Sequence, residues 1–239
     1  MSHRDRASLD LFHPHLPVNN TMQSLHLLLP RFARVLTMLA LMVPAACSVL
    51  PQAPRALTYD FGPAAQSDSA AQPNTLAPLV LTDVQASVAL DSNAVLYRLA
   101  YADVQQLHPY TMARWTMAPA QLLRQRVREA LSQSRTVLQP GDAGTARMPV
   151  LHLDLEEFSQ VFVSASQSHA LLRVRATLTQ PIVPGLAPVA APHQANFVLQ
   201  VTASTPDAAG GVHALAQASD ALVVQLLEWL RHADSARGP

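Results

Sequence analysis

The sequence predicts an α+β fold: a mostly antiparallel sheet with a long hairpin, packed against a middle helix and a C-terminal helix. Two alternating apolar runs, 150–163 and 169–179, flank a short polar stretch and predict the hairpin. Apolar residues at helical spacing follow Pro119 and recur from Leu215 onward. The candidate strands are interrupted by the first of these helices and followed by the second, which indicates an α+β fold.

The composition describes a neutral chain with a single core. Its 239 residues carry 16 positive side chains, all of them Arg, against 16 acidic ones. Because there is no basic tail or stripe, we expect no nucleic-acid partner and no electrostatic binding to anionic lipid. The single cysteine excludes an internal disulfide. About 190 residues remain after the leader described next, which is the size of one domain.

A secretory leader is predicted over residues 1–46. Two arginines precede the apolar run Val35–Val43, and two alanines lead from Pro44 to Cys47. A helix needs about 20 apolar residues to span a bilayer, so this run of nine is an export signal and not an anchor. Met22 is an alternative start to Met1, because it would give a leader of ordinary length.

Cys47 resembles the acylated cysteine of a bacterial lipobox. Pro44 departs from the usual pattern, which prefers Leu at that position. The alternative is a buried or free cysteine behind an ordinary signal. Acyl chains contribute about 0.8 kcal/mol per buried methylene, so two or three of them would hold the protein on a membrane. We therefore predict a lipidated tether over residues 47–56.

Strands are predicted in the first half of the domain, with one internal loop. The runs typical of strands are Leu57–Phe61, Leu79–Val84 and Ala94–Tyr101. Residues 64–78 are rich in Ala, Gln, Ser and Pro and predict a flexible loop. Asp103–His108 predicts a further short strand that ends at Pro109, because proline cannot donate to a ladder.

The middle helix is predicted over 120–134, with Pro119 in its first turn. Leu123, Val127, Ala130 and Leu131 share its apolar face. We expect Arg124, Arg128 and Arg135 to lie away from that face.

The hairpin needs a β-bulge. Leu151, Leu153 and Leu155 have one parity, whereas Phe158 and Phe162 have the other. An extra residue at Glu156-Glu157 would return both aromatics to the apolar face. Neighbouring acids can act as general acid and base, but adjacent strand residues point to opposite faces, so we interpret this pair as a solvated bulge. The inward residues of the following strands are Ala170, Leu172, Val174, Ala176 and Leu178, then Phe197, Leu199 and Val201.

The C-terminal helix is predicted to open at Thr205-Pro206-Asp207, with Thr205 as its cap. Gly210 and Gly211 weaken the first turn, so we expect the regular part to begin near Val212. The predicted buried stripe is Leu215, Ser219, Leu222, Val223, Leu226 and Leu230, with Trp229 at one margin.

These features together resemble the ABC-type transport auxiliary lipoproteins. The residues that carry the resemblance are Tyr97-Arg98, Arg114-Trp115 followed by Pro119 and Leu122-Leu123, Leu155–Phe158, and Trp229. The resemblance runs from Leu57 to His232 and implies one domain over 57–233, followed by a disordered tail at 234–239. No single motif is decisive, but the ordered set behind a lipobox is fairly specific.

The resemblance also implies a function. Such lipoproteins work in the periplasm with an ABC transporter, its permease and ATPase, and an MCE-domain substrate-binding protein. The systems move phospholipid or other hydrophobic molecules across the Gram-negative envelope. Ser48 stands where an inner-membrane retention signal has Asp, which implies that Cys47 sits in the inner leaflet of the outer membrane. The family has no established catalytic residues.

The residues themselves indicate binding rather than catalysis. No nucleophile elbow, HExxH motif or phosphate loop is present, and no His pair has ligand spacing on one helix face. We therefore predict no enzyme activity, no cofactor and no metal. The interface candidates are Tyr101, Tyr110, Arg114 and Trp115, because aromatics and Arg dominate interface hot spots. The alternative for Trp115 is that it seals the helix against the sheet.

Three functions follow from this sequence. The favoured one is a structural adaptor of a lipid-transport assembly, docked on the transporter and open to self-association with a second copy. A lipid carrier would need an apolar cavity of several hundred cubic ångströms. An envelope hydrolase would need a nucleophile and base that converge in space.

Overall fold

The computed structural model describes residues 55–63, 76–180 and 191–235, all of which belong to one compact unit, Pro54–Pro239. The predicted leader, Cys47 and the tether as far as residue 54 lie outside the described residues. The same holds for 64–75, most of the predicted loop.

The described elements are strands, two α-helices and one short 3-10 helix. In chain order they are β1 (Leu57–Tyr59), β2 (Leu76–Leu81), β3 (Gln85–Ala86), β4 (Ala94–Leu99), β5 (Asp103–Trp115), α2 (Pro119–Ser132), β6 (Arg135–Leu138), η2 (Thr145–Arg147), β7 (Val150–Phe162), β8 (Ser168–Thr179), β9 (His193–Thr202) and α3 (Ala208–Ser235). The α+β class is therefore confirmed.

The sheet is mixed, which corrects the expectation of a mostly antiparallel one. β7 is its centre: β8 and then β9 follow on one side, and β2, β3 and β4 each pair with part of the other side. The long β7–β8 and β8–β9 pairings and the β4–β5 pairing are antiparallel. The β1–β5, β2–β6, β2–β7, β3–β7 and β4–β7 pairings are parallel. Strand direction was missed because alternation reports which face a residue occupies and not how a strand runs.

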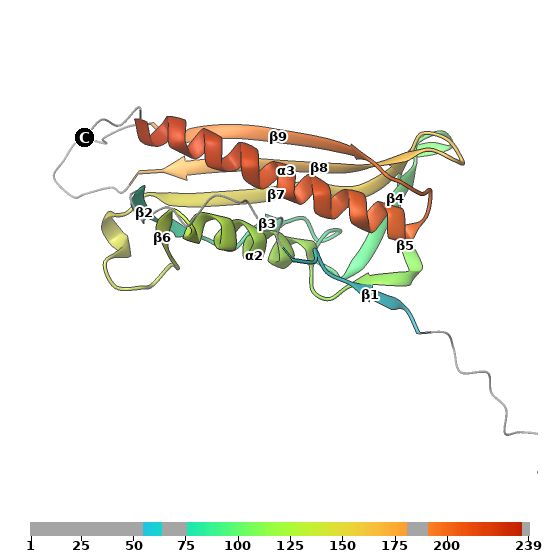
Figure 1. Ribbon diagram of the computed structural model, residues 1–239, viewed down its shortest axis with the longest axis horizontal. Coiled ribbons are helices and arrows are strands. Elements are labelled where there is room, and N and C mark those ends of the chain that lie inside the picture. Colours follow the sequence, from blue (N-terminus) through green and yellow to red (C-terminus); the bar gives the residue numbers. More distant parts are fainter. Residues whose placement is uncertain (1–54, 64–75, 181–190, 236–239) are drawn as a thin grey trace, which may run out of the picture. The chain divides into compact units, whose positions relative to one another are not determined.

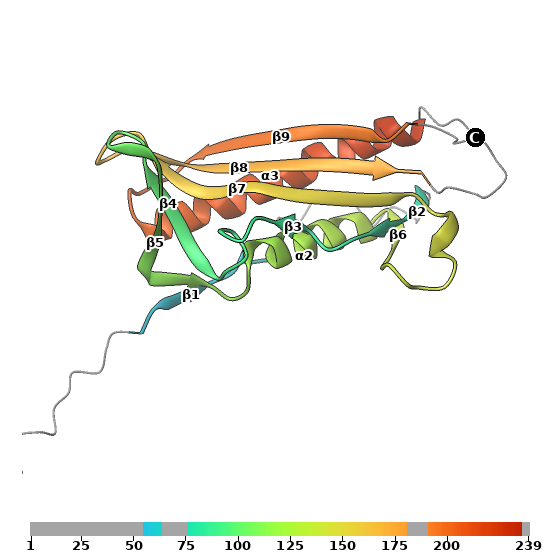
Figure 2. The ribbon, with the colours of Figure 1, turned by 180° about the vertical axis from the view of Figure 1, so that it is seen from behind.

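Both helices cover the same face of the sheet. In Figure 1 α3 crosses in front of β7, β8 and β9 with α2 beside it, and in Figure 2, from behind, the strands lie in front of α3. The core fills the space between these layers. The entire stripe predicted for α3 is buried, as are the five predicted inward residues of β8. Trp229 packs at the margin, edge-on to Phe197 with ring centroids 6.3 Å apart.

The predicted hairpin and its bulge are confirmed. β7 and β8 pair from Val150 with Thr179 to Phe162 with Ser168, and the register shifts between Leu155 and Glu157. Leu155 and Phe158 are both buried as a result. A single extra residue lets two runs of opposite parity face the same core.

Pro109 does not end a strand, contrary to the prediction. β5 is one strand of 13 residues that passes through Pro109. On its outer side only Ala113–Trp115 pair with β1, so Pro109 lies where β5 is an edge strand. An edge position tolerates a residue without an N–H.

The middle helix is placed correctly, but Arg135 is not. α2 begins at Pro119, and Leu123, Val127 and Leu131 are buried. Arg135 lies beyond the helix in β6, a strand that the sequence did not predict, and it is only 2% exposed.

α3 is capped two residues later than predicted, but its regular part begins before Val212 and its end lies beyond the predicted one. Asp207, rather than Thr205, is its cap: the Asp207 carboxylate accepts the Gly210 N–H at 2.8 Å. That bond, together with one from the Thr205 hydroxyl, holds the pKa of Asp207 below its ordinary value. At the other end, α3 includes Asp234 and Ser235, which were assigned to the tail.

Candidate interaction surface

Trp115 lies inside the core. It is 1% exposed, and its ring lies 5.6 Å from Phe61 and 5.6 Å from Phe158. The contact with Phe61 is edge-on, a favourable arrangement for two aromatic rings. Trp115 therefore joins β5 to β7 and to the segment after β1. It packs the domain and presents almost no surface to a partner.

Tyr110 belongs to a hydrogen-bonded cluster formed by residues of β5, β7 and β8. Its hydroxyl donates to Gln160 Oε1 at 2.8 Å, and Gln160 Nε2 donates to Ser168 Oγ at 2.7 Å. The Tyr110 ring also packs on Tyr97, with centroids 4.6 Å apart. Burial, followed by the nearby Tyr97 and Asp207, raises the pKa of Tyr110 well above its ordinary value.

Close neighbours explain the two glycines at the start of α3, and for Gly211 that neighbour belongs to the same cluster. A Cβ on Gly211 would overlap Gln160 Oε1, and one on Gly210 would overlap the backbone of Thr205. Glycine is needed here for close approach, and its helix-weakening effect is outweighed by that packing. This is why α3 is regular through both glycines.

Arg114 and Tyr101 have different surroundings. The Arg114 guanidinium donates to the carbonyls of Tyr110 and Ala113, so it is used within its own strand. Tyr101 lies in the turn between β4 and β5 and is 53% exposed. The structure thus brings Tyr110, Arg114 and Trp115 together along β5 and leaves Tyr101 apart, as the exposed member of the four.

Tyr101 forms an exposed apolar patch with Val104 and Val163, which we call the tip patch. The β4–β5 turn and the β7–β8 turn lie side by side at one end of the domain (Figures 1 and 2), and Ala100 N–H donates to Phe162 O at 2.9 Å. All three side chains are exposed. The valines were not predicted, because Val104 at the start of β5 and Val163 just after β7 are far apart in the chain.

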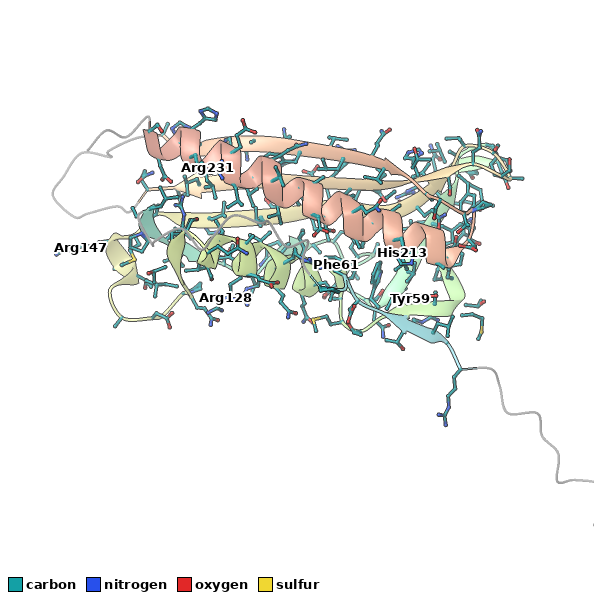
Figure 3. All side chains as sticks on the ribbon, viewed as in Figure 1. Tyr59, Phe61, Arg128, Arg147, His213 and Arg231 are labelled. Atoms are coloured by element: carbon teal, nitrogen blue, oxygen red, sulfur yellow. The ribbon has the colours of Figure 1, made fainter. Side chains whose placement is uncertain are left out.

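A pocket of about 340 Å³ opens between the end of β1 and α2. Its lining residues are Asp60, Phe61, Gly62, Thr116, Met117, Leu122, Gln125, Arg126 and Glu129. Phe61 is labelled in Figure 3. The volume is at the low end of the range for small-molecule sites.

The buried cation at this pocket is already neutralised. Arg126 donates to the carbonyls of Phe61 and Gly62, each at 2.8 Å, and its Nη1 lies 3.1 Å from Asp220 Oδ1. Burial raises the pKa of Asp220 above its ordinary value; Arg126 opposes this increase and Glu129 adds to it. Arg126 therefore ties the end of β1 to α3, and sequence analysis missed it because an Arg near an apolar stripe gives no sign of its partner.

The two acids at the bulge form structural ion pairs. Glu157 binds Arg98 at 3.0 Å and accepts the Ser159 hydroxyl at 2.7 Å. Glu156 pairs with Arg173 and Arg175 on the exposed face of β8. The prediction of a solvated pair is correct for Glu156 but wrong for Glu157, which Arg98 covers.

The described part of the chain contains neither a membrane-spanning helix nor a metal site. None of its helices combines the length and apolar character needed to cross a membrane. Within the same residues, no group of three His, Cys, Asp or Glu side chains could hold a metal ion.

Comparison with known families decides the assignment. The family described as the ABC-type transport auxiliary lipoprotein component matches residues 59–226, more than half of the chain. The chain belongs to this family. It is a family of lipoproteins that assist ABC-type transport and is not known as an enzyme family. A search of the curated proteins gives no match.

Solved structures agree at the level of the fold. A Xanthomonas campestris protein of the DUF330 family is 20% identical, with a TM-score of 0.53 over 66% of this chain and 87% of the other. A second, uncharacterised protein is 13% identical, with a TM-score of 0.53 over 74% and 99% of the two chains. At these identities the likeness concerns the fold alone.

Proposed function

We propose that this ABC-transport auxiliary lipoprotein is a structural adaptor held at the inner leaflet of the outer membrane by acyl chains on Cys47. It faces the periplasm and docks on the MCE-domain protein and the permease and ATPase of the transporter. The assembly moves phospholipid or another hydrophobic molecule across the envelope. Family membership over 59–226, behind a leader that ends at a cysteine, is the observation that supports this proposal.

The length of the tether supports a role close to the membrane. Ten residue steps separate Cys47 from Leu57, the start of β1. A fully extended chain covers about 3.3–3.6 Å per residue, so roughly 35 Å is the largest reach. An anchored domain of this kind can meet only those transporter parts that come near the same membrane.

The adaptor is favoured over the lipid carrier by the character of the described interior. The side chains facing the helices form a packed core, and the pocket beside Arg126 is small and partly polar. A bilayer lipid needs a longer apolar enclosure. The tip patch is the docking candidate, because its apolar side chains are exposed and a backbone hydrogen bond joins its two segments.

Anchoring is tested by replacing Cys47 with Ser in cells. We expect uncleaved precursor, or release of the domain into the soluble periplasmic fraction. Ser48→Asp should move the protein to the inner membrane. Normal processing and outer-membrane fractionation of the Cys47→Ser variant would contradict lipidation.

Docking is tested by photo-crosslinking from the tip patch in intact cells. A crosslinkable residue at Tyr101 should capture the MCE-domain protein or a permease subunit. The matched control is Val224, an exposed residue of α3 outside the patch. Equal capture from both positions, or capture of neither transporter component from Tyr101, would contradict this docking surface.

A further inference from the structure

The long free edge of the sheet is not explained by the proposed function. β9 pairs with β8 in unbroken antiparallel register from Leu178 with His193 to His169 with Thr202. No strand among the described residues pairs with its other side. Such an edge presents a row of backbone N–H and C=O groups to any strand that approaches.

The other edges of the sheet are protected, whereas β9 is not. β1 has three residues and β6 has four, so neither offers a long template. The uncovered part of β5 contains Pro109, and its pairing with β4 shifts register twice. β9 contains no proline, no bulge and no Asp, Glu or Arg. Natural sheets use these devices to prevent edge pairing, and the described β9 has none of the three.

We propose that the partner is a second copy of this chain, with β9 paired antiparallel to β9 about a two-fold axis at Val198. The facing pairs would be Val198 with Val198, Phe197 with Leu199, Ala195 with Val201, Asn196 with Gln200, and Gln194 with Thr202. Every pair joins like with like: apolar to apolar, or polar to polar. Cross-strand pairs of this kind stabilise a sheet, and no charge meets its own copy.

Exposure and charge support a second copy over a foreign strand. Val198 is 58% exposed at the middle of β9, and on the opposite face of the same strand the partly buried Trp229 packs against Phe197. Apolar and aromatic groups of this kind are typical of the centre of an interface. The chain has zero formal net charge, so two copies do not repel each other at long range.

The register is tested by disulfide crosslinking of full-length protein in detergent. Val198→Cys should form a covalent dimer, because facing residues of an antiparallel pair lie within disulfide distance. Gln194→Cys and Thr202→Cys should each remain monomeric and should crosslink only when mixed. Val224→Cys, an equally exposed valine on α3, is the matched control, and the unsubstituted protein reports any background from Cys47.

The proposal is overturned if Val198→Cys stays monomeric or crosslinks no better than Val224→Cys. A Val198→Cys adduct with a different protein would show that the edge accepts a foreign strand instead. Independently, Val198→Asp should raise the dimer dissociation constant at least about tenfold in sedimentation equilibrium, since two like charges would face each other. An unchanged constant, with an unchanged thermal melt, would also overturn the dimer. Neither test depends on lipidation or on the transporter.

Discussion

The β7–β8–β9 half of the sheet and the paired strands β4 and β5, which we call the arm, are built in different ways. The first has one bulge in otherwise continuous antiparallel pairing along β7, β8 and β9. In the second, the β5 partner of β4 jumps from Arg114 to Pro109, and again from His108 to Asp103. Regular pairing stabilises the first region, whereas individual side-chain contacts stabilise the second. The two regions should therefore respond differently to substitution.

The largest expected effect separates the base of the arm from its tip. Trp115→Ala should lower the free energy of unfolding by about 3–5 kcal/mol, because it removes a buried aromatic between Phe61 and Phe158. Tyr101→Ala, at the exposed tip, should change it by less than about 0.5 kcal/mol. Urea unfolding followed by circular dichroism measures both. Similar losses in the two variants would contradict this division of the arm.

The next effect compares a buried ion pair with an exposed one. Arg135 Nη2 lies 2.6 Å from Asp234 Oδ2 and ties β6 to the end of α3. Asp234→Ala leaves the buried Arg135 charge without this carboxylate and should cost about 3–5 kcal/mol.

Glu156→Ala is the matched control on the exposed face of β8. It removes surface pairs with Arg173 and Arg175 and should cost no more than about 1 kcal/mol. Chemical denaturation measures the loss of unfolding free energy in each variant at low and at high salt. The loss in Glu156→Ala should shrink at high salt and the loss in Asp234→Ala should not, because only the surface pairs are screened. If the loss in Asp234→Ala also depended on salt, it would contradict the burial of Arg135, which is 2% exposed.

A smaller effect tests the junction where the arm meets α3. Gly211→Ala should destabilise the domain by about 1–3 kcal/mol, because the new methyl overlaps Gln160 Oε1. In a Gln160→Ala background the same change should cost much less. A double-mutant cycle measures this coupling. Additive losses would mean that the glycine is required for another reason.

Most of the regular half could be predicted from the sequence. In the arm both strands were predicted, but the continuation of β5 through Pro109 to Trp115 was not. The parity change between Leu155 and Phe158 predicts the bulge because alternation is a local property. The predictions for Pro109 and Arg135 were wrong, and Arg126 was not predicted, for a common reason: the role of each residue depends on which strand or helix is nearby. The same limit applies to Tyr110 and Trp115, whose residue types suggested an interface while tertiary packing uses them inside the domain.

The smallest expected effect concerns Tyr110 and pH. Tyr110→Phe removes the hydrogen bond to Gln160 and should cost about 1 kcal/mol at neutral pH. The folded-state pKa of Tyr110 is raised, so its stabilising contribution is complete below the ordinary tyrosine pKa of about 10 and declines as pH rises above it. Unfolding measured from pH 8 to 11 should therefore show a steeper alkaline loss in the natural protein than in Tyr110→Phe. Parallel pH curves would contradict this.

Intact-mass and peptide mass spectrometry of the mature protein purified from membranes tests the anchored-adaptor account most directly. We predict an N-terminal peptide that begins at Cys47 and carries acyl chains on that residue. A mature chain that retains an unmodified Cys47 thiol, or begins at another residue, would contradict the account.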